Sequence, residues 1–180
     1  MKVKFDKTTG LVSWEIGDKD ISIHFPDLFC AFNHGANLIK VKEKDKNLKV
    51  SYSVYNIEGE FILSYNYLDN KVRFKSKVIT IDNRQIIGSD FDEARNVLVV
   101  LNKSEEKEFL SLYNSNGEFL SSIPSPYDFR FFKLSNYKGN VRVIAHGLQE
   151  KSADEFGRND WIFLINVDNY YVEKKKIIQL

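Results

Sequence analysis

The stretch YNIEGEFI at residues 55–62 returns almost unchanged as YNSNGEFL at residues 113–120. Each copy has the pattern of a strand end, a turn with glycine where a positive φ is needed, and a new strand opened by phenylalanine. A weaker copy, INVDNYYV, spans residues 165–172, where Asn169 replaces the glycine and can also adopt the left-handed conformation. A fourth candidate, FDKTTGLV at residues 5–12, has a turn one residue longer. The chain therefore repeats a β-hairpin.

The segments before these hairpins recur as well. A strand is predicted to open at each of Asn37, Asn96 and Asn140, and a further short strand precedes each of them. These preceding strands are expected at residues 28–32, 86–91 and 129–134. The repeating unit is thus strand, strand, hairpin and strand, in an antiparallel arrangement. Residues 71–81, with alternating Val, Phe and Ile, predict one strand outside this pattern.

The unit recurs at roughly 50–58 residues and resembles the blade of a β-propeller, whose repeats typically span about 40–50 residues. Three units and an N-terminal half unit are fewer than the four to eight blades of a closed ring. The sequence therefore predicts an all-β chain of antiparallel four-stranded blade-like repeats, forming an open partial β-propeller or a curved meander stack. The alternative is that such hairpins recur by chance, as they can in any all-β protein. We expect a single all-β domain that spans residues 1–180. Within it, a half repeat is expected at residues 1–25 and full repeats at about 28–82, 85–124 and 127–180.

Composition narrows the class of partner. The chain has 180 residues, 26 Lys plus Arg and 25 Asp plus Glu, so it lacks the basic excess typical of a nucleic-acid binder. The first ten residues contain no apolar signal-peptide core. The longest aliphatic run, residues 97–101, is far shorter than the roughly 20 residues that span a membrane. We therefore expect a cytoplasmic protein with neither nucleic acid nor membrane as its partner.

No motif indicates catalysis. His24, His34 and His146 lack the spacing of zinc ligands, and Cys30 lies in an apolar strand without a flanking base. Phosphate-binding glycine loops, nucleophile elbows and metalloprotease motifs are absent from the sequence. The sequence therefore predicts no catalytic residue, no metal, no cofactor and no enzyme activity. Cys30 is expected to act as a small buried hydrophobic residue.

Two acidic segments are candidates for binding a partner. Asp90, Asp92 and Glu93 form the sharpest cluster, and Asp90 and Asp92 would share one face of a strand, as a cation site or a carboxylate pair requires. Because this segment ends a strand and leads into the next one, a solvated turn is the preferred interpretation, and the functional alternative is a partner-binding patch rather than a catalytic pair.

The second candidate is the insertion at residues 148–160, which breaks the repeat and is expected to form a short helix or a loop. Long loops on a rigid β scaffold often carry binding residues, although a disordered surface loop is an equal alternative. The proposed contact residues are Asp154, Glu155, Phe156, Arg158 and Asp160, with Phe156 as the apolar anchor.

A small, neutral chain without catalytic motifs is similar in type to the immunity proteins that bacteria encode beside contact-dependent growth-inhibition toxins. That resemblance implies a non-catalytic protein-binding module that neutralises a cognate toxin. Acidic side chains would mimic phosphate if the toxin is a nuclease. The alternative is a carbohydrate-binding or hydrolytic domain with Trp14 and Trp161 as sugar platforms. A fragment of a larger propeller, or a subunit of an oligomer, is a third possibility.

Overall fold

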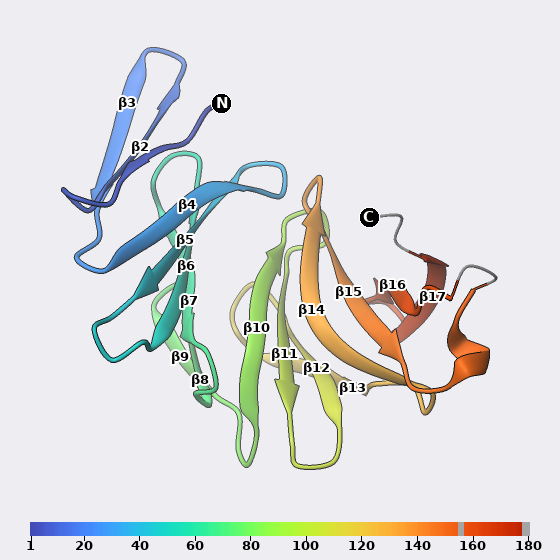
Figure 1. Cartoon of the computed structure of the whole chain (residues 1–180). Coiled ribbons are helices and arrows are strands. Elements are labelled where there is room, and N and C mark those ends of the chain that lie inside the picture. The colour runs from blue at the N-terminus through green and yellow to red at the C-terminus, as the bar shows by residue number, and fades with distance from the viewer. Residues whose placement is uncertain (155–156, 178–180) are drawn as a thin grey trace.

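The computed structural model describes residues 1–154 and 157–177, and almost all of its regular structure is β (Figure 1). Over these residues the strands form four antiparallel sheets, and within each sheet neighbouring strands follow one another along the chain. None of these four sheets closes on itself. The prediction of an all-β, antiparallel structure is confirmed.

The first two sheets have three and six strands. The first consists of β1 (Lys4–Asp6), β2 (Leu11–Ile16) and β3 (Lys19–His24). The second consists of β4 (Leu28–His34), β5 (Leu38–Lys44), β6 (Val50–Asn56), β7 (Phe61–Asn66), β8 (Lys71–Phe74) and β9 (Lys77–Thr80). The prediction of a single extra strand at residues 71–81 is wrong. That segment forms the hairpin β8–β9, which pairs with β7 and enlarges the second sheet from four strands to six.

The third and fourth sheets have four strands each, as the repeat predicts. The third consists of β10 (Gln85–Asp92), β11 (Val97–Lys103), β12 (Glu108–Tyr113) and β13 (Phe119–Pro124). The fourth consists of β14 (Phe129–Tyr137), β15 (Asn140–Gly147), β16 (Asp160–Asn166) and β17 (Tyr171–Ile177). The described part of the insertion contains one turn of 3-10 helix, η1 (Glu150–Ser152). No helix in residues 1–154 and 157–177 is long and apolar enough to cross a membrane.

The two best copies of the sequence repeat adopt the same turn. Gly59 and Gly117 both have positive φ, 87° and 75°. In each turn the side-chain oxygen of the asparagine, Asn56 or Asn114, accepts a hydrogen bond from the backbone N–H four residues on, at 2.8 and 3.0 Å. The aromatic rings that flank each turn also meet edge to face, with centroids 5.8 and 5.7 Å apart. The predicted equivalence of these two hairpins is confirmed.

Strand β11 explains how the sheets are joined. Successive side chains of a strand point to opposite faces. Leu98 and Val100 accordingly belong to the core between the second and third sheets, whereas Val97, Val99 and Leu101 belong to the core between the third and fourth. A third apolar cluster joins the first sheet to the second. The four sheets are therefore held together face to face, in chain order, by three separate cores.

Candidate functional site

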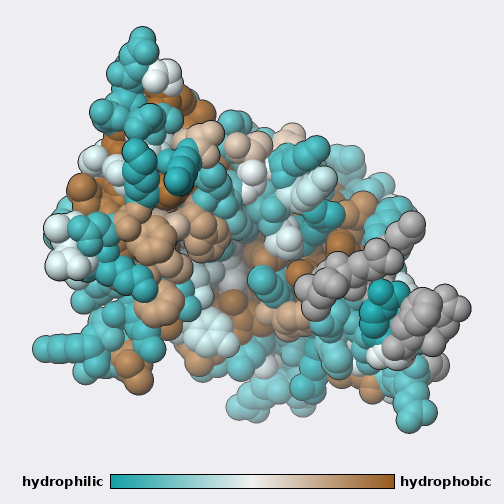
Figure 2. Space-filling model, turned by 45° about the horizontal axis from the view of Figure 1, so that its top comes forward, coloured by the Kyte–Doolittle hydropathy of each residue, from teal (hydrophilic) through white to brown (hydrophobic). Residues whose placement is uncertain are grey.

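A cleft of about 490 Å3 opens where three sheets meet. It is lined by residues of β4–β7 in the second sheet, by β10 of the third sheet and by β14 of the fourth. The face of the molecule in Figure 2 is hollowed near its middle, and apolar side chains there lie beside hydrophilic ones. Segments more than a hundred residues apart in the chain thus contribute to one concave surface.

The first strands of these three sheets share an irregularity that shapes the cleft. The register with the next strand shifts at Phe29 in β4, at Ile87 in β10 and at Phe132 in β14. A β-bulge bends its strand and redirects a side chain, and bulges are common beside functional sites. Ile87 and Phe132 both line the cleft. Two of the three bulged residues, one from the third sheet and one from the fourth, therefore form part of the cleft wall.

Lys40 is the buried cation of the cleft. In β5 it shares a face with Leu38, which belongs to the core between the second and third sheets, so its side chain is directed to the same side. The residue is 9% exposed. Its Nζ donates a hydrogen bond to the carbonyl oxygen of Ser89 at 3.4 Å. The rings of Tyr52 and Tyr65 also lie near Nζ, with centroids 5.5 and 5.7 Å from it.

Asp90 is the buried anion beside this cation. Its side chain is completely shielded from solvent. Nε2 of His34 lies 2.5 Å from Asp90 Oδ2, and the backbone N–H of Phe91 donates to Oδ1 at 2.8 Å. The side-chain amide of Asn136 donates to the same Oδ1 at 3.5 Å. Asp90 in β10 is thereby connected to β4 of the second sheet and to β14 of the fourth.

These groups shift one another's ionisation. Burial lowers the pKa of Lys40; the charge of Asp90 opposes this shift, and Lys133 adds to it. Burial acts to raise the pKa of Asp90, but the charge of Lys40 and the hydrogen bond from His34 outweigh it, so that pKa lies below its usual value. Burial also raises the pKa of Tyr65. An ionised, fully buried carboxylate therefore lies beside a poorly solvated lysine that lines the cleft.

The rim of the cleft is aromatic and cationic. Phe32, Tyr67 and Phe132 are 43%, 49% and 46% exposed, although aromatic side chains of this size are usually more buried. Lys42 and Lys133 also line the cleft. Such a surface can hold an anionic group against flat apolar walls.

The first predicted acidic patch is mostly internal. Asp90 and Asp92 have no exposed surface, so the expectation of a solvated turn is wrong for both. Asp92 pairs with Arg95 and accepts a hydrogen bond from the backbone N–H of Val141 at 2.7 Å. Glu93 is half-buried and accepts hydrogen bonds from the backbone N–H groups at positions 36 and 37, at 3.0 and 3.2 Å. All three carboxylates connect sheets, because buried carboxylates require hydrogen-bond partners.

The second predicted patch is partly described. Asp154 forms an ion pair with Arg158, with 2.6 Å between Oδ2 and the guanidinium. Asp160 lies 2.8 Å from Nδ1 of His146, and both side chains are exposed. Glu155 and Phe156 lie outside the described residues. The insertion between β15 and β16 thus carries the ion pair of Asp154 and Arg158, and neither residue lines the cleft.

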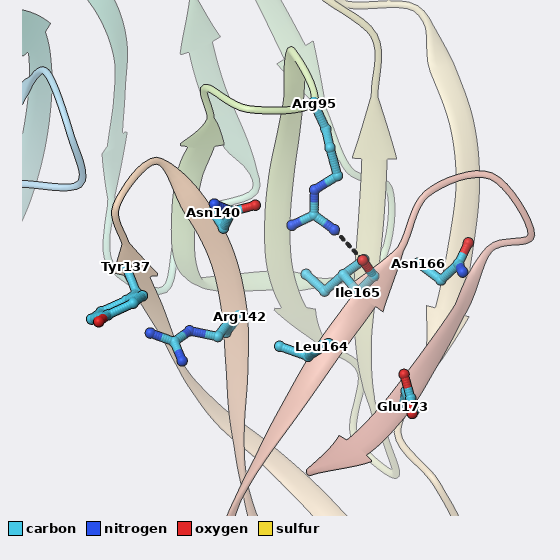
Figure 3. A pocket seen from close by; sticks show the side chains of 8 residues that line it. All are labelled: Arg95, Tyr137, Asn140, Arg142, Leu164, Ile165, Asn166 and Glu173. Carbon is cyan, nitrogen blue, oxygen red and sulfur yellow. Dashed lines mark hydrogen bonds between the residues drawn. The ribbon is translucent and has the colours of Figure 1, made fainter.

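A second hollow, of about 390 Å3, lies among the third and fourth sheets and is lined by both Arg95 and Arg142 (Figure 3). The Nε atoms of these arginines are buried and have no hydrogen-bond partner in residues 1–154 and 157–177. Their guanidinium groups do not converge: that of Arg95 points to the carbonyl oxygen of Ile165, whereas that of Arg142 turns towards the Tyr137 ring, 4.3 Å away. The hollow therefore does not present a shared anion site.

Other expected groups have ordinary surroundings. Trp14 is 2% exposed and donates a hydrogen bond to the carbonyl oxygen of Ile57, so it cannot serve as a sugar platform. Trp161 is half-buried, and Nζ of Lys174 lies 3.5 Å from its ring centroid. Cys30 is partly exposed rather than buried as expected. Within the described ranges no three His, Cys, Asp or Glu side chains are grouped so that they could hold a metal ion.

Sequence reasoning missed the cleft but contained one signal for it. Lys40 interrupts the otherwise apolar run LIKV at residues 38–41, and a lysine in a buried strand is rare unless it has a specific environment. His34 is the other missed residue, since the sequence was examined only for its spacing as a zinc ligand. Comparisons of the chain with protein-family models, with curated proteins and with solved structures found no match.

Proposed function

We propose that this protein is a non-catalytic binding module that holds a segment of a partner protein in the cleft between β4–β7, β10 and β14. The observation that carries this proposal is the group of exposed aromatic side chains around the cleft, Phe32, Tyr67 and Phe132. Aromatic residues are enriched in protein interfaces, and the residues that contribute most to binding are usually aromatic side chains or arginines near the interface centre.

The arrangement of the sheets supports an open partial β-propeller as the finer description of the fold. In a propeller, four-stranded sheets surround a central channel. Here the first strands of three successive sheets, β4, β10 and β14, contribute to one cleft, and each carries a bulge. An unclosed array of this kind leaves its inner strands accessible to a protein segment.

A narrower proposal is that the partner is a bacterial toxin, which the protein neutralises as an immunity protein. The acidic side chains of the insertion, Asp154 and Asp160, would then make a second contact with the toxin, outside the cleft. Co-expression with the protein encoded beside it should restore growth that this neighbour alone prevents, and calorimetry should show direct binding. A neighbouring gene that encodes no toxin, or a toxin that does not bind, would exclude this narrower role.

The binding proposal can be tested without knowing the partner. A phage-displayed library of random 12-residue peptides is selected on the immobilised wild-type protein. Selected peptides should lose about tenfold or more in affinity for the double variant Phe32→Ala/Phe132→Ala, because truncating a central aromatic side chain typically weakens binding by about 2 kcal/mol or more.

The control is Phe5→Ala. Phe5 lies in β1 of the first sheet and is not among the residues that line the cleft, and its 42% exposure matches that of the two tested residues. Peptides that bind the double variant and the wild type equally would place the binding surface elsewhere. A selection that yields no peptide with measurable affinity would contradict the proposal itself.

A further inference from the structure

The ammonium group of Lys40 has fewer hydrogen-bond acceptors than it has hydrogens to donate. A lysine ammonium offers three donors, and buried charged groups are normally well hydrogen-bonded. The described residues give Lys40 one acceptor, the Ser89 carbonyl oxygen, at 3.4 Å, which is long for a hydrogen bond of this kind. The residue is nonetheless 9% exposed and lines the cleft. The unused donor capacity of Lys40 is therefore available only to a group that enters the cleft.

Asp90 does not satisfy that capacity. Its Oδ2 is engaged by His34 at 2.5 Å, and its Oδ1 by the backbone N–H of Phe91 at 2.8 Å. Lys42 and Lys133 line the same cleft, whereas none of its described lining residues is an Asp or a Glu. The uncompensated charge inside the cleft is positive, and an occupant with a negative charge would be attracted.

The aromatic residues that line the cleft favour an occupant in which a flat apolar group lies next to the negative charge. The rings of Tyr52 and Tyr65 are stacked, with centroids 5.1 Å apart, and both line the cleft. Tyr67 and Phe132 add two further exposed rings at the rim. Aromatic rings placed like these bind apolar and aromatic groups through their faces and edges.

A single negative charge fits better than a phosphate. Among the described residues that line the cleft there is no arginine, whose planar fork matches the oxygens of phosphate. The buried charge of Asp90, close enough to Lys40 to oppose the fall in its pKa, would also repel a dianion more strongly than a monoanion.

We propose that the cleft is a carboxylate receptor: an Asp or Glu side chain of the partner protein, next to an aromatic residue, enters it and binds the Lys40 ammonium. This inference rests on the proposed function, because it names the chemistry of the segment that the module recognises. The carboxylate supplies the acceptors that Lys40 lacks, and the neighbouring aromatic residue contacts Tyr67 and Phe132.

The first test uses a small probe and does not require a partner. Phenylacetate is titrated into the 15N-labelled protein, with phenylacetamide as the uncharged control, and the amide resonances of Gly88 and Ser89 are followed. Phenylacetate should bind and phenylacetamide should not. Lys40→Met should weaken binding by about tenfold or more, since a hydrogen bond to a charged group contributes about 1.5–3 kcal/mol.

Two further variants keep this test decisive. Lys44→Met changes an exposed lysine of the same strand outside the cleft and should leave binding unchanged. Lys42→Met changes a partly exposed cleft residue, so it provides a test even if Lys40→Met does not fold, and it should weaken binding about threefold. Equal binding of phenylacetate to the wild type and both cleft variants would overturn the inference. Tighter, Lys40-dependent binding of inorganic phosphate would also overturn it, in favour of a phosphate ligand.

The selected peptides separate this inference from the proposed function. Replacement of their Asp or Glu by Asn or Gln should weaken binding to the wild type about tenfold but have little effect on binding to Lys40→Met, as expected when the two groups interact directly. Peptides that depend on Phe32 and Phe132 but carry no required acid would overturn the carboxylate receptor and leave the binding module intact. Phenylacetate binding without any selected peptide would overturn the binding of a protein segment and would leave only the attraction of the cleft for a small carboxylate.

Discussion

Asp90 connects three of the four sheets through its side-chain hydrogen bonds. It lies in the third sheet, accepts from His34 of the second, and contacts Asn136 of the fourth. Its pKa is depressed below the ordinary value of 3.8, so the folded protein binds the Asp90 proton less readily than the unfolded chain does. By linkage, the stability that this carboxylate contributes is fully present above about pH 4 and is lost as the pH falls through the lower, folded-state pKa.

Replacing Asp90 by Asn should therefore destabilise the protein in a pH-dependent way. At neutral pH, Asp90→Asn should lower the free energy of unfolding by about 1–3 kcal/mol, because the amide loses the charge that Lys40 and His34 stabilise. The difference from the wild type should shrink as the pH falls below 4. Urea denaturation between pH 2.5 and 7 measures it, and Asp20→Asn, an exposed residue of β3, is the control. A constant difference across this range would mean that folding does not shift the pKa of Asp90.

The sequence could identify some of these residues but not their roles. The cluster at residues 90–93 stood out by composition, and a polar strand end normally predicts a solvated turn. The structure buries Asp90 and Asp92 because their partners, including His34, Asn136 and Val141, come from other sheets. A single sequence carries no local signal for pairings between segments so distant from one another. Lys40 was visible as a cation in an apolar strand, whereas the cleft around it was not.

At the level of the elements, the hairpins were the most predictable feature, because their determinants are local. Asparagine, glycine and the flanking aromatic residues all lie within eight residues of one another, and both copies form the same turn. The hairpin β8–β9 was read as one strand because no second copy of it exists for comparison. The sequence does not reveal that the two glycine turns are packed against different neighbouring residues.

That difference predicts unequal effects of the same substitution. A Cβ at Gly59 would lie 2.9 Å from Cγ2 of Ile21 in the first sheet, whereas the nearest atom to a Cβ at Gly117 is Cδ of Lys77, at 3.4 Å. Gly117→Ala should cost about 1 kcal/mol through its positive φ alone. Gly59→Ala should cost roughly 1 kcal/mol more, because Ile21 must also shift. Thermal and urea denaturation of the two variants compare them directly, and equal losses would show that the first sheet does not press on this turn.

At the scale of the whole molecule, the local stability of a strand should depend on how many of its faces and edges are covered by neighbouring sheets and strands. The third sheet is covered on both faces, by the core it shares with the second sheet and by the core it shares with the fourth. The run VLVVL at residues 97–101 was recognised from sequence as aliphatic, and its burial from both sides explains why it does not alternate with polar residues. Strand β9, at the edge of the second sheet, has one neighbouring strand, and its Val78 is 65% exposed.

Hydrogen exchange should therefore be slowest in β11 and much faster in β9. Amides of a strand with both faces buried and both edges paired open only when neighbouring sheets separate, whereas an edge strand can detach locally. We expect the backbone amides of β11 to exchange at least about tenfold more slowly than those of β9, after correction for the intrinsic rates of the unfolded chain. Exchange measured by mass spectrometry on peptides covering residues 77–80 and 97–103 makes the comparison. Equal protection of the two strands would mean that the four sheets open as a single cooperative unit, because local detachment of β9 would then be no easier than separation of the sheets around β11.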